Sequence, residues 1–214
     1  LTVRAYTMAA HVWCEPMFQL GASQFAIANH PVPAIAAPVR PELTVEETEQ
    51  EIRIRSLNGE LTFSKVNGTV SEWKASGRDV MASGPQVGFW HPLVDNHAQE
   101  YDSLWKDNFI DVMQTSTRKV SWKQDGNAVV VTVSQRIAPP VRAFGMLVYT
   151  VLPSGRVDLK VSGEPYGDYS DIIPRIGISF EVPGCDRAVE WYGHGPGENY
   201  PDSLRANPVG HYRT

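Results

Sequence analysis

The sequence has 214 residues and a mass of 23.7 kDa, enough for one or two domains with a buried hydrophobic core. Hydrophobic residues make up 42% and charged residues 20%, a globular composition that excludes a disordered chain. The net charge is -5 and no basic patch stands out, which argues against a nucleic-acid partner. No apolar stretch is long enough for a membrane span, so we expect no membrane partner.

The N-terminal part predicts two short strands followed by a linker. Residues 1–6 alternate apolar and polar side chains, as a half-buried strand does, and residues 25–27 form a second short apolar run. Between residues 29 and 41, four prolines fix φ and remove backbone donors, which suits an extended linker. We therefore expect a domain boundary there.

Two turn dipeptides predict β-hairpins. Asn58-Gly59 separates the apolar positions of residues 52–57 from those of residues 61–63, and it accepts the positive φ angles of a type I′ turn. Asp125-Gly126 leads into an alternating strand over residues 128–137. Further strands are expected around residues 70–73, 144–152, 157–161, 176–182 and 188–192.

One segment predicts a helix. Its apolar side chains recur at three- and four-residue steps, at Tyr101, Leu104, Trp105, Phe109 and Val112. The rest of the chain consists of short strands separated by turns. That pattern predicts an all-β fold, an antiparallel β-sandwich.

Two cysteines, Cys14 and Cys185, lie far apart and lack the spacing of a metal or redox motif. We expect both to be small core residues. The first residues lack the basic-then-apolar pattern of a secretory signal, which predicts a cytoplasmic location. A strand directly at Leu1 and a turn-rich stretch just before Thr214 suggest a piece of a larger protein.

The first of three polar-aromatic clusters spans residues 88–100. Its polar and aromatic members are Trp90, His91, Asp95, Asn96, His97 and Glu100. One interpretation is a helix-capping loop, because Asp and Asn favour turns and caps. The other is sugar recognition, in which short polar groups bind hydroxyls and an aromatic face covers the C–H side of the ring.

Two further clusters follow the later strands. Residues 162–175 carry the acids Glu164, Asp168 and Asp171, and we favour a solvated loop over a ligand site. Residues 191–202 contain three glycines that permit tight turns, among the polar residues His194, Glu198, Asn199, Tyr200 and Asp202. No helix pattern follows and no Lys-Ser/Thr pair closes this loop, so it is not a dinucleotide or P-loop site.

Several stretches resemble the C-terminal region of glycoside hydrolase family 2 β-galactosidases. The matching stretches are residues 89–105, 137–140, 162–169, 172–174 and 192–203, and the likeness runs in order from about residue 43 to residue 207. The pattern Gly-Pro-x-Glu-Asn-Tyr-x-Asp, from Gly195 to Asp202, is specific to these enzymes.

The resemblance implies a fold and its boundaries. Residues 44–214 would be the N-terminal part of a large antiparallel β-sandwich, the small-chain domain, which is similar to galactose mutarotase. Residues 31–43 would be the Pro-rich linker. Residues 1–30 would be the closing strands of an immunoglobulin-like domain.

The resemblance also implies an activity for a larger parent. The parent would hydrolyse terminal β-D-galactosides such as lactose by a retaining mechanism, with both catalytic glutamates outside this region. We therefore expect no catalytic residue, metal ligand or cofactor here, whereas Mg²⁺ and a monovalent cation would belong to the parent. This region would shape the mouth of the active site through a mobile loop. The substrate-binding residues carried over are Asp95, Asn96, His97, Gln99 and Glu100, and the loop with His194, Glu198, Asn199, Tyr200 and Asp202 would be a structural one near the site.

The implied partners are the remaining domains of the parent, a galactoside and a separate small subunit. The small subunit follows from His97, which stands where many members have Asp and which resembles the evolved-type branch. Two alternatives stay open. One is a free-standing carbohydrate-binding sandwich with Trp90, Trp105 and Tyr192 as stacking platforms. The other is a mutarotase-like epimerase that uses His194 or His97 with Glu198 as acid and base.

Overall fold

The computed structural model describes residues 1–28, 43–138, 146–164, 173–184 and 188–214. Its contacts divide the chain into two compact units, one of residues 1–35 and 184–214 and the other of residues 36–183. The Pro-rich segment and Cys185 lie outside the described residues. The predicted boundaries at residues 30, 43 and 44 stay predictions.

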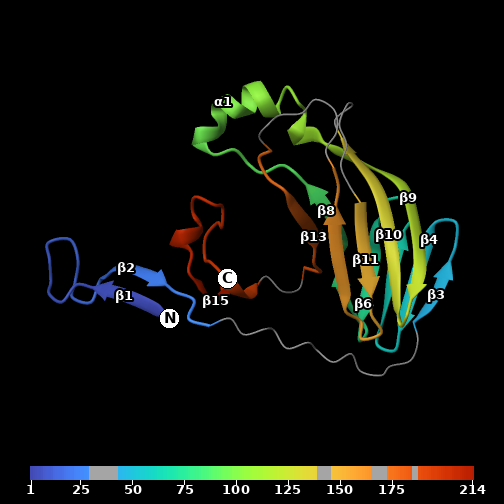
Figure 1. The fold of residues 1–214 in the computed structure, drawn as a ribbon, viewed down its shortest axis with the longest axis horizontal. Coiled ribbons are helices and arrows are strands. Elements are labelled where there is room, and N and C mark those ends of the chain that lie inside the picture. The colour runs from blue at the N-terminus through green and yellow to red at the C-terminus, as the bar shows by residue number, and fades with distance from the viewer. Residues whose placement is uncertain (29–42, 139–145, 165–172, 185–187) are drawn as a thin grey trace. The chain divides into compact units, whose positions relative to one another are not determined.

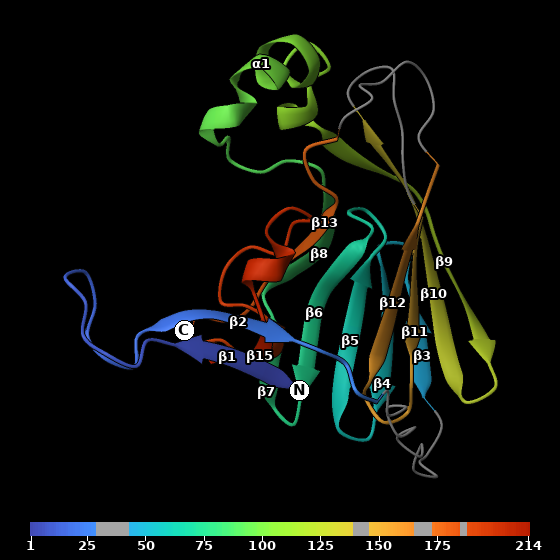
Figure 2. The ribbon, with the colours of Figure 1, turned by 60° about the vertical axis from the view of Figure 1, so that its left-hand side comes forward.

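Residues 36–183 contain two antiparallel sheets in their described part, and the views show them as facing layers (Figures 1 and 2). The larger sheet has the order β13-β8-β6-β5-β4-β3, with β7 paired to β6, and the smaller has the order β12-β11-β10-β9. The strands of the larger sheet are β3 (Thr44–Glu47), β4 (Glu51–Ser56), β5 (Gly59–Ser64), β6 (Thr69–Ala75), β7 (Arg78–Met81), β8 (Ser83–Gly88) and β13 (Gly177–Glu181). The strands of the smaller sheet are β9 (Gln114–Asp125), β10 (Ala128–Ala138), β11 (Met146–Val151) and β12 (Val157–Ser162).

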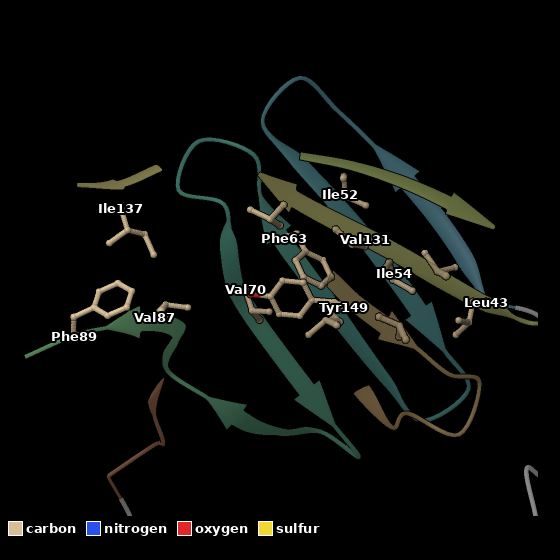
Figure 3. Close-up of a cluster of buried hydrophobic side chains, with 14 of the residues drawn as sticks. Leu43, Ile52, Ile54, Phe63, Val70, Val87, Phe89, Val131, Ile137 and Tyr149 are labelled. Atoms are coloured by element: carbon tan, nitrogen blue, oxygen red, sulfur yellow. The ribbon is translucent and has the colours of Figure 1, made fainter. Parts of the chain in front are cut away.

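The hydrophobic core lies between these two sheets, where both contribute alternate residues (Figure 3). On β4, Ile52 and Ile54 are buried while Arg53 and Arg55 form ion pairs on the outer face. On β10, the valines at positions 129, 131 and 133 are all fully buried. This period of two is what a sheet with one buried face requires. The all-β class and the antiparallel sandwich predicted from the sequence are confirmed.

The two sheets are also linked at their surface. The indole N–H of Trp122 on β9 donates to Glu47 Oε2 on β3 over 2.8 Å, and Lys65 forms an ion pair with the same carboxylate. The hydrogen bond from Lys65, followed by the one from Trp122, lowers the pKa of Glu47 below its ordinary value. This carboxylate is therefore occupied by structural contacts.

Both predicted hairpins are present, but one turn differs from the prediction. Asp125-Gly126 begins the β9–β10 turn with Gly126 at a φ of 57°. The β4–β5 loop consists of Leu57 and Asn58, neither with a positive φ, so the type I′ prediction was wrong. Gly59 is instead the first residue of β5, where a Cβ would overlap the Lys74 carbonyl oxygen. The lack of a side chain at Gly59 lets β5 and β6 approach each other closely at this point.

The predicted helix is shorter and more irregular than its periodicity suggested. Its parts are η1 (Asp95–His97), α1 (Ala98–Glu100), the π-helical turn η2 (Tyr101–Trp105) and η3 (Ile110–Val112). Continuous helix ends at Trp105 because the Asn108 amide donates to the Leu104 carbonyl and Phe109 has a left-handed φ of 57°. None of the helices in the described ranges is long and apolar enough to cross a membrane.

The other unit contains two hairpins in its described part. Strands β1 (Thr2–Tyr6) and β2 (Gln19–Gln24) form one pair, and β14 (Glu190–His194) and β15 (Val209–Arg213) form the other, with η4 (Leu204–Ala206) between them. The strand predicted at residues 25–27 was wrong, because Leu1 to Tyr6 pair with residues 19–25. Cys14 is half-exposed beside Thr7, so it is not a core residue as predicted.

The Gln24 side chain joins the two hairpins. Its Nε2 donates to the Val209 carbonyl over 2.8 Å, and the Val209 N–H donates to its Oε1 over 2.6 Å. An amide side chain thus pairs with a backbone amide as a neighbouring strand would.

Candidate functional site

An aromatic cluster supports the loop in which the sequence predicted sugar-binding residues. We call it the Trp105 cluster, and it consists of Trp90, His91, His97, Tyr101 and Trp105. The Trp105 side chain is 2% exposed. The His97 and Trp90 rings contact it edge to face, with centroid distances of 5.1 and 6.1 Å. Such edge-to-face pairs are favourable beyond their buried area.

The Trp105 cluster joins residues from two segments of the chain. Trp90 and His91 follow the last residue of β8, whereas Tyr101 and Trp105 lie one helical turn apart on η2. The Trp90 and Tyr101 rings lie 5.8 Å apart, and Lys106 Nζ stands 5.9 Å from the Tyr101 ring centre. The end of the sheet and the helical segment are therefore packed on each other, which places the loop between them.

The predicted substrate-binding residues lie together on this loop. Asp95, Asn96 and His97 form η1, while Gln99 and Glu100 belong to α1. The Asn96 and Gln99 side chains are exposed, whereas the structure does not describe the side chains of Asp95 and Glu100.

His97 faces inward from the loop. Its ring lies 5.3 Å from that of His91, and its Nδ1 is buried without a hydrogen-bond partner among the described residues. A buried polar atom without a partner is costly. A shift of the loop that opened this atom to water or a hydroxyl would remove the cost.

A second loop, between β14 and β15, is held by a buried asparagine. Asn207 is 7% exposed, and its Oδ1 accepts the Gly197 N–H over 2.9 Å. Its Nδ2 donates to the carbonyls of Glu198 and Ser203, and its own carbonyl accepts the Nδ1–H of His194 over 2.6 Å. One side chain thus satisfies three backbone groups of the loop.

The predicted residues of this second loop lie at the surface, and two of their side chains bond to its backbone. His194, Glu198, Asn199, Tyr200 and Asp202 are all exposed. Asn199 Nδ2 donates to the His194 carbonyl over 3.3 Å, and Glu198 contributes through its own carbonyl. The loop belongs to the unit of residues 1–35 and 184–214, while residues 95–105 belong to the other unit.

Sequence reasoning gave no role to Asn207. The available signal was the dipeptide Asn207-Pro208 just before a strand, which is typical of a turn. That signal locates the turn but does not reveal the three backbone partners of the side chain.

Replacing Asn207 with alanine should destabilise the unit of residues 1–35 and 184–214 by about 2–3 kcal/mol, because three partly buried backbone groups lose a partner. Urea unfolding followed by circular dichroism would measure the change. Asn199→Ala is the matched control, since Asn199 is exposed and makes one long hydrogen bond. An equal effect of the two substitutions would contradict the role of Asn207.

The cluster of residues 162–175 was the remaining candidate for a ligand or metal site. Asp168 and Asp171 lie outside the described residues, and Glu164 is exposed. No group of three or more His, Cys, Asp or Glu side chains in the described ranges is placed to hold a metal ion.

Known proteins match this chain over a small part of their own length. The β-galactosidase of Kluyveromyces lactis is 28% identical over 176 aligned positions, and the match covers 78% of this chain and 17% of that protein. The β-galactosidase of Lactobacillus delbrueckii subsp. bulgaricus is 25% identical over 97% of this chain and 21% of that protein. The β-galactosidase of Vibrio cholerae is 25% identical over a match that covers 78% of this chain and 17% of that protein. The chain thus spans about a fifth of the length of these curated relatives.

A protein-family model described as "Beta galactosidase small chain" matches residues 55–214. The match includes strands β5 to β13 of the sandwich, the Trp105 cluster and the loop around Asn207. It therefore covers most of the chain. The chain belongs to the β-galactosidase small chain family.

Proposed function

We propose that this chain is a non-catalytic part of a larger glycoside hydrolase family 2 enzyme that hydrolyses terminal β-D-galactosides with retention. The observation that carries the proposal is the pattern of matches. The chain belongs to the small chain family, yet it spans about a fifth of the β-galactosidases that resemble it. The chemistry would then come from the other four fifths of the parent.

Two carboxyl groups of the described residues are unsuited to the acid role that the parent reaction needs. Retaining hydrolysis needs two carboxyl groups about 5–5.5 Å apart, and the one that acts as acid needs a raised pKa. Within the described ranges, the carboxyl groups with a resolved shift are Glu47 and Glu72, and a lysine lowers the pKa of each. Lowered values hold these groups ionised, which is unsuited to a general acid.

The role proposed for residues 95–100 is to border the galactoside at the mouth of the active site. Asn96 and Gln99 expose amide groups that donate and accept hydrogen bonds, as sugar hydroxyls require. The Trp105 cluster holds the residues before and after this segment and also His97 within it, so movement of the segment would separate the His97 ring from Trp105 while both ends stay in place. Asp95, His97 and Glu100 complete the proposed contacts.

The proposed partners are the remaining domains of the parent and, by the evolved-type likeness of His97, a separate small subunit. The β1–β2 hairpin exposes apolar side chains, such as Val12, Met8 and Leu1. Exposed apolar side chains of this kind are typical of a surface that a partner covers. The cytoplasmic location stays a prediction.

The alternative of a free-standing sugar-binding sandwich loses one of its three platforms. Trp105 is buried, so its ring face is not open to a sugar. Trp90 is half-buried and packs on Trp105, while Tyr192 is exposed. No observation favours the epimerase alternative over the proposal.

The test is the activity of the 214-residue chain on o-nitrophenyl β-D-galactoside. We expect no release of nitrophenol above the buffer rate and no acceleration of galactose anomer exchange in polarimetry. Release that disappears on replacing one carboxylate of this chain would overturn the proposal, and so would accelerated anomer exchange.

A second experiment addresses the loop in the full-length enzyme that carries this sequence. Asn96→Ala with Gln99→Ala should lower kcat/KM by about 30-fold, because each of the two lost hydrogen bonds to a hydroxyl is worth about 1 kcal/mol. Asn127→Ala, in the turn between β9 and β10, is the control and should leave kcat/KM unchanged. An unchanged kcat/KM in the double variant would contradict the proposed contacts of the loop.

A further inference from the structure

Strand β13 forms one end of the larger sheet and carries an exposed apolar stripe. In the described part of the unit its strand neighbour is β8, so the other edge of β13 is open (Figure 1). Four apolar side chains occupy alternate positions on the strand and at its two ends, and they are 43–70% exposed. They are Ile176, Ile178, Phe180 and Val182. An open edge strand with an apolar face is a template for pairing with another chain.

The apolar stripe continues the face that is buried on β8. Ile178 lies opposite Val87 in the pairing register, so the two side chains share one face of the sheet. Val87 belongs to the buried core, whereas Ile178 is exposed. A register shift places Gly84 and Pro85 of β8 together against Phe180, which leaves the alternation of β13 intact. The described strands of the smaller sheet therefore cover this face at β8 and leave it open at β13.

The opposite face of β13 has small residues in its middle and opposite charges at its ends. Gly177 and Ser179 lie between Arg175 and Glu181 at alternate positions, and both charged side chains are exposed. Arg175 Nε stands 2.8 Å from the position that a Cβ on Gly177 would take. The guanidinium therefore lies over Gly177, beside any residue that pairs with this glycine across the open edge.

The apolar stripe is complementary to itself in one antiparallel register. With Ser179 opposite Ser179 of a second copy, Ile178 faces Phe180, and Ile176 faces Val182. All four apolar side chains then have an apolar neighbour on the same face. Sliding one strand by two residues in either direction leaves one of the four without such a neighbour, and sliding it by one residue sets the apolar face against the polar face.

The same register also pairs the charges. Gly177 faces Glu181 of the second copy, and the Arg175 guanidinium lies over that glycine. Each carboxylate thus comes beside the guanidinium of the other copy. A twofold axis through the two Ser179 residues makes this contact occur twice.

We propose that two copies of this chain associate through β13, antiparallel and in this register. The backbone N–H and C=O groups of the two open edges would pair with each other, as in other cases of strand addition. The two apolar stripes would cover part of each other's surface. The inference uses none of residues 95–100 and does not depend on the proposed function.

Sedimentation velocity of the 214-residue chain over a range of concentrations tests the association. We expect a reversible equilibrium between monomer and dimer in the micromolar range. Phe180→Lys puts a charge into the apolar stripe at an exposed position, so it should abolish the dimer and leave the circular dichroism spectrum unchanged. A dimer that persists in this folded variant would overturn the proposal. A monomer at millimolar concentration would also overturn it and would leave the remaining domains of the parent as the occupant of the stripe.

Charge exchange tests the register. Arg175→Glu alone and Glu181→Arg alone should each weaken the dimer by about tenfold, because each sets like charges side by side at two symmetric points. The two substitutions together restore opposite charges, and this double variant should dimerise within about threefold of the unchanged chain. A double variant no better than the single ones would overturn the proposal.

Arg118→Glu is the matched control. It changes the net charge as Arg175→Glu does, at an exposed position on β9, which is the end strand of the smaller sheet. We expect it to leave the equilibrium between monomer and dimer unchanged. An effect equal to that of Arg175→Glu would overturn the proposal, because net charge alone would then govern the association.

Discussion

Replacing Trp105 with alanine is expected to destabilise the unit of residues 36–183 by about 3–5 kcal/mol, as large-to-small changes at fully buried aromatic positions do. The indole is 2% exposed and contacts the rings of Trp90, His91 and His97. Its removal leaves a cavity beneath the loop of residues 95–100. Because the loop has lost its base, it should also become more accessible to protease than the sandwich around it.

Urea unfolding and limited proteolysis would measure both effects. Trp13→Ala is the matched control, since this tryptophan is 64% exposed and its loss should change stability by about 1 kcal/mol or less. If Trp105→Ala were as mild as the control, or if cleavage did not begin within residues 95–109, Trp105 would not be the anchor of this loop.

The sandwich followed from strand patterns because alternation reports burial directly. On β4, the order Ile-Arg-Ile-Arg places the two isoleucines in the core and the two arginines outside, whatever the partner strand is. The valines of β10 behave in the same way. Both hairpins were predicted for the same reason, since each turn dipeptide stood between two alternating runs.

The wrong predictions occur where a contact with a residue outside the local pattern decides the structure. The repeat of apolar residues predicted helix up to Val112, but the Asn108 amide closes the helix on Leu104. The glycine of Asn58-Gly59 predicted a turn, although the neighbouring strand at Lys74 is what requires it. The pairing of Gln24 with Val209 joins residues 185 positions apart, which no window of sequence reveals.

The candidate site was predictable in position but not in roles. The clustering of polar and aromatic residues between 88 and 100 located the loop correctly on the helical segment. It did not distinguish the exposed amides of Asn96 and Gln99 from the buried ring of Trp105. Exposure depends on which face packs on Trp90 and His91, and the sequence of the loop contains no information about that face.

The core pair of Phe63 and Tyr149 allows a second prediction with a large effect. The two rings come from opposite sheets and meet edge to face, with centroids 4.9 Å apart. Phe63 is fully buried, so Phe63→Ala should cost about 3–5 kcal/mol in the free energy of unfolding. Tyr149 differs because its hydroxyl is buried without a hydrogen-bond partner among the described residues.

Tyr149→Phe should therefore leave stability unchanged or raise it by up to about 1 kcal/mol, since it removes a buried polar group and keeps the ring. Burial raises the pKa of Tyr149 well above its ordinary value. Above about pH 10 the unfolded chain loses this proton while the folded chain keeps it, so stability falls as pH rises. The phenylalanine variant lacks this contribution, and its advantage should grow between about pH 9 and 11. Urea unfolding of the unchanged chain and of Tyr149→Phe across that pH range would measure the difference. A loss of stability in Tyr149→Phe at neutral pH would show that the hydroxyl has a partner.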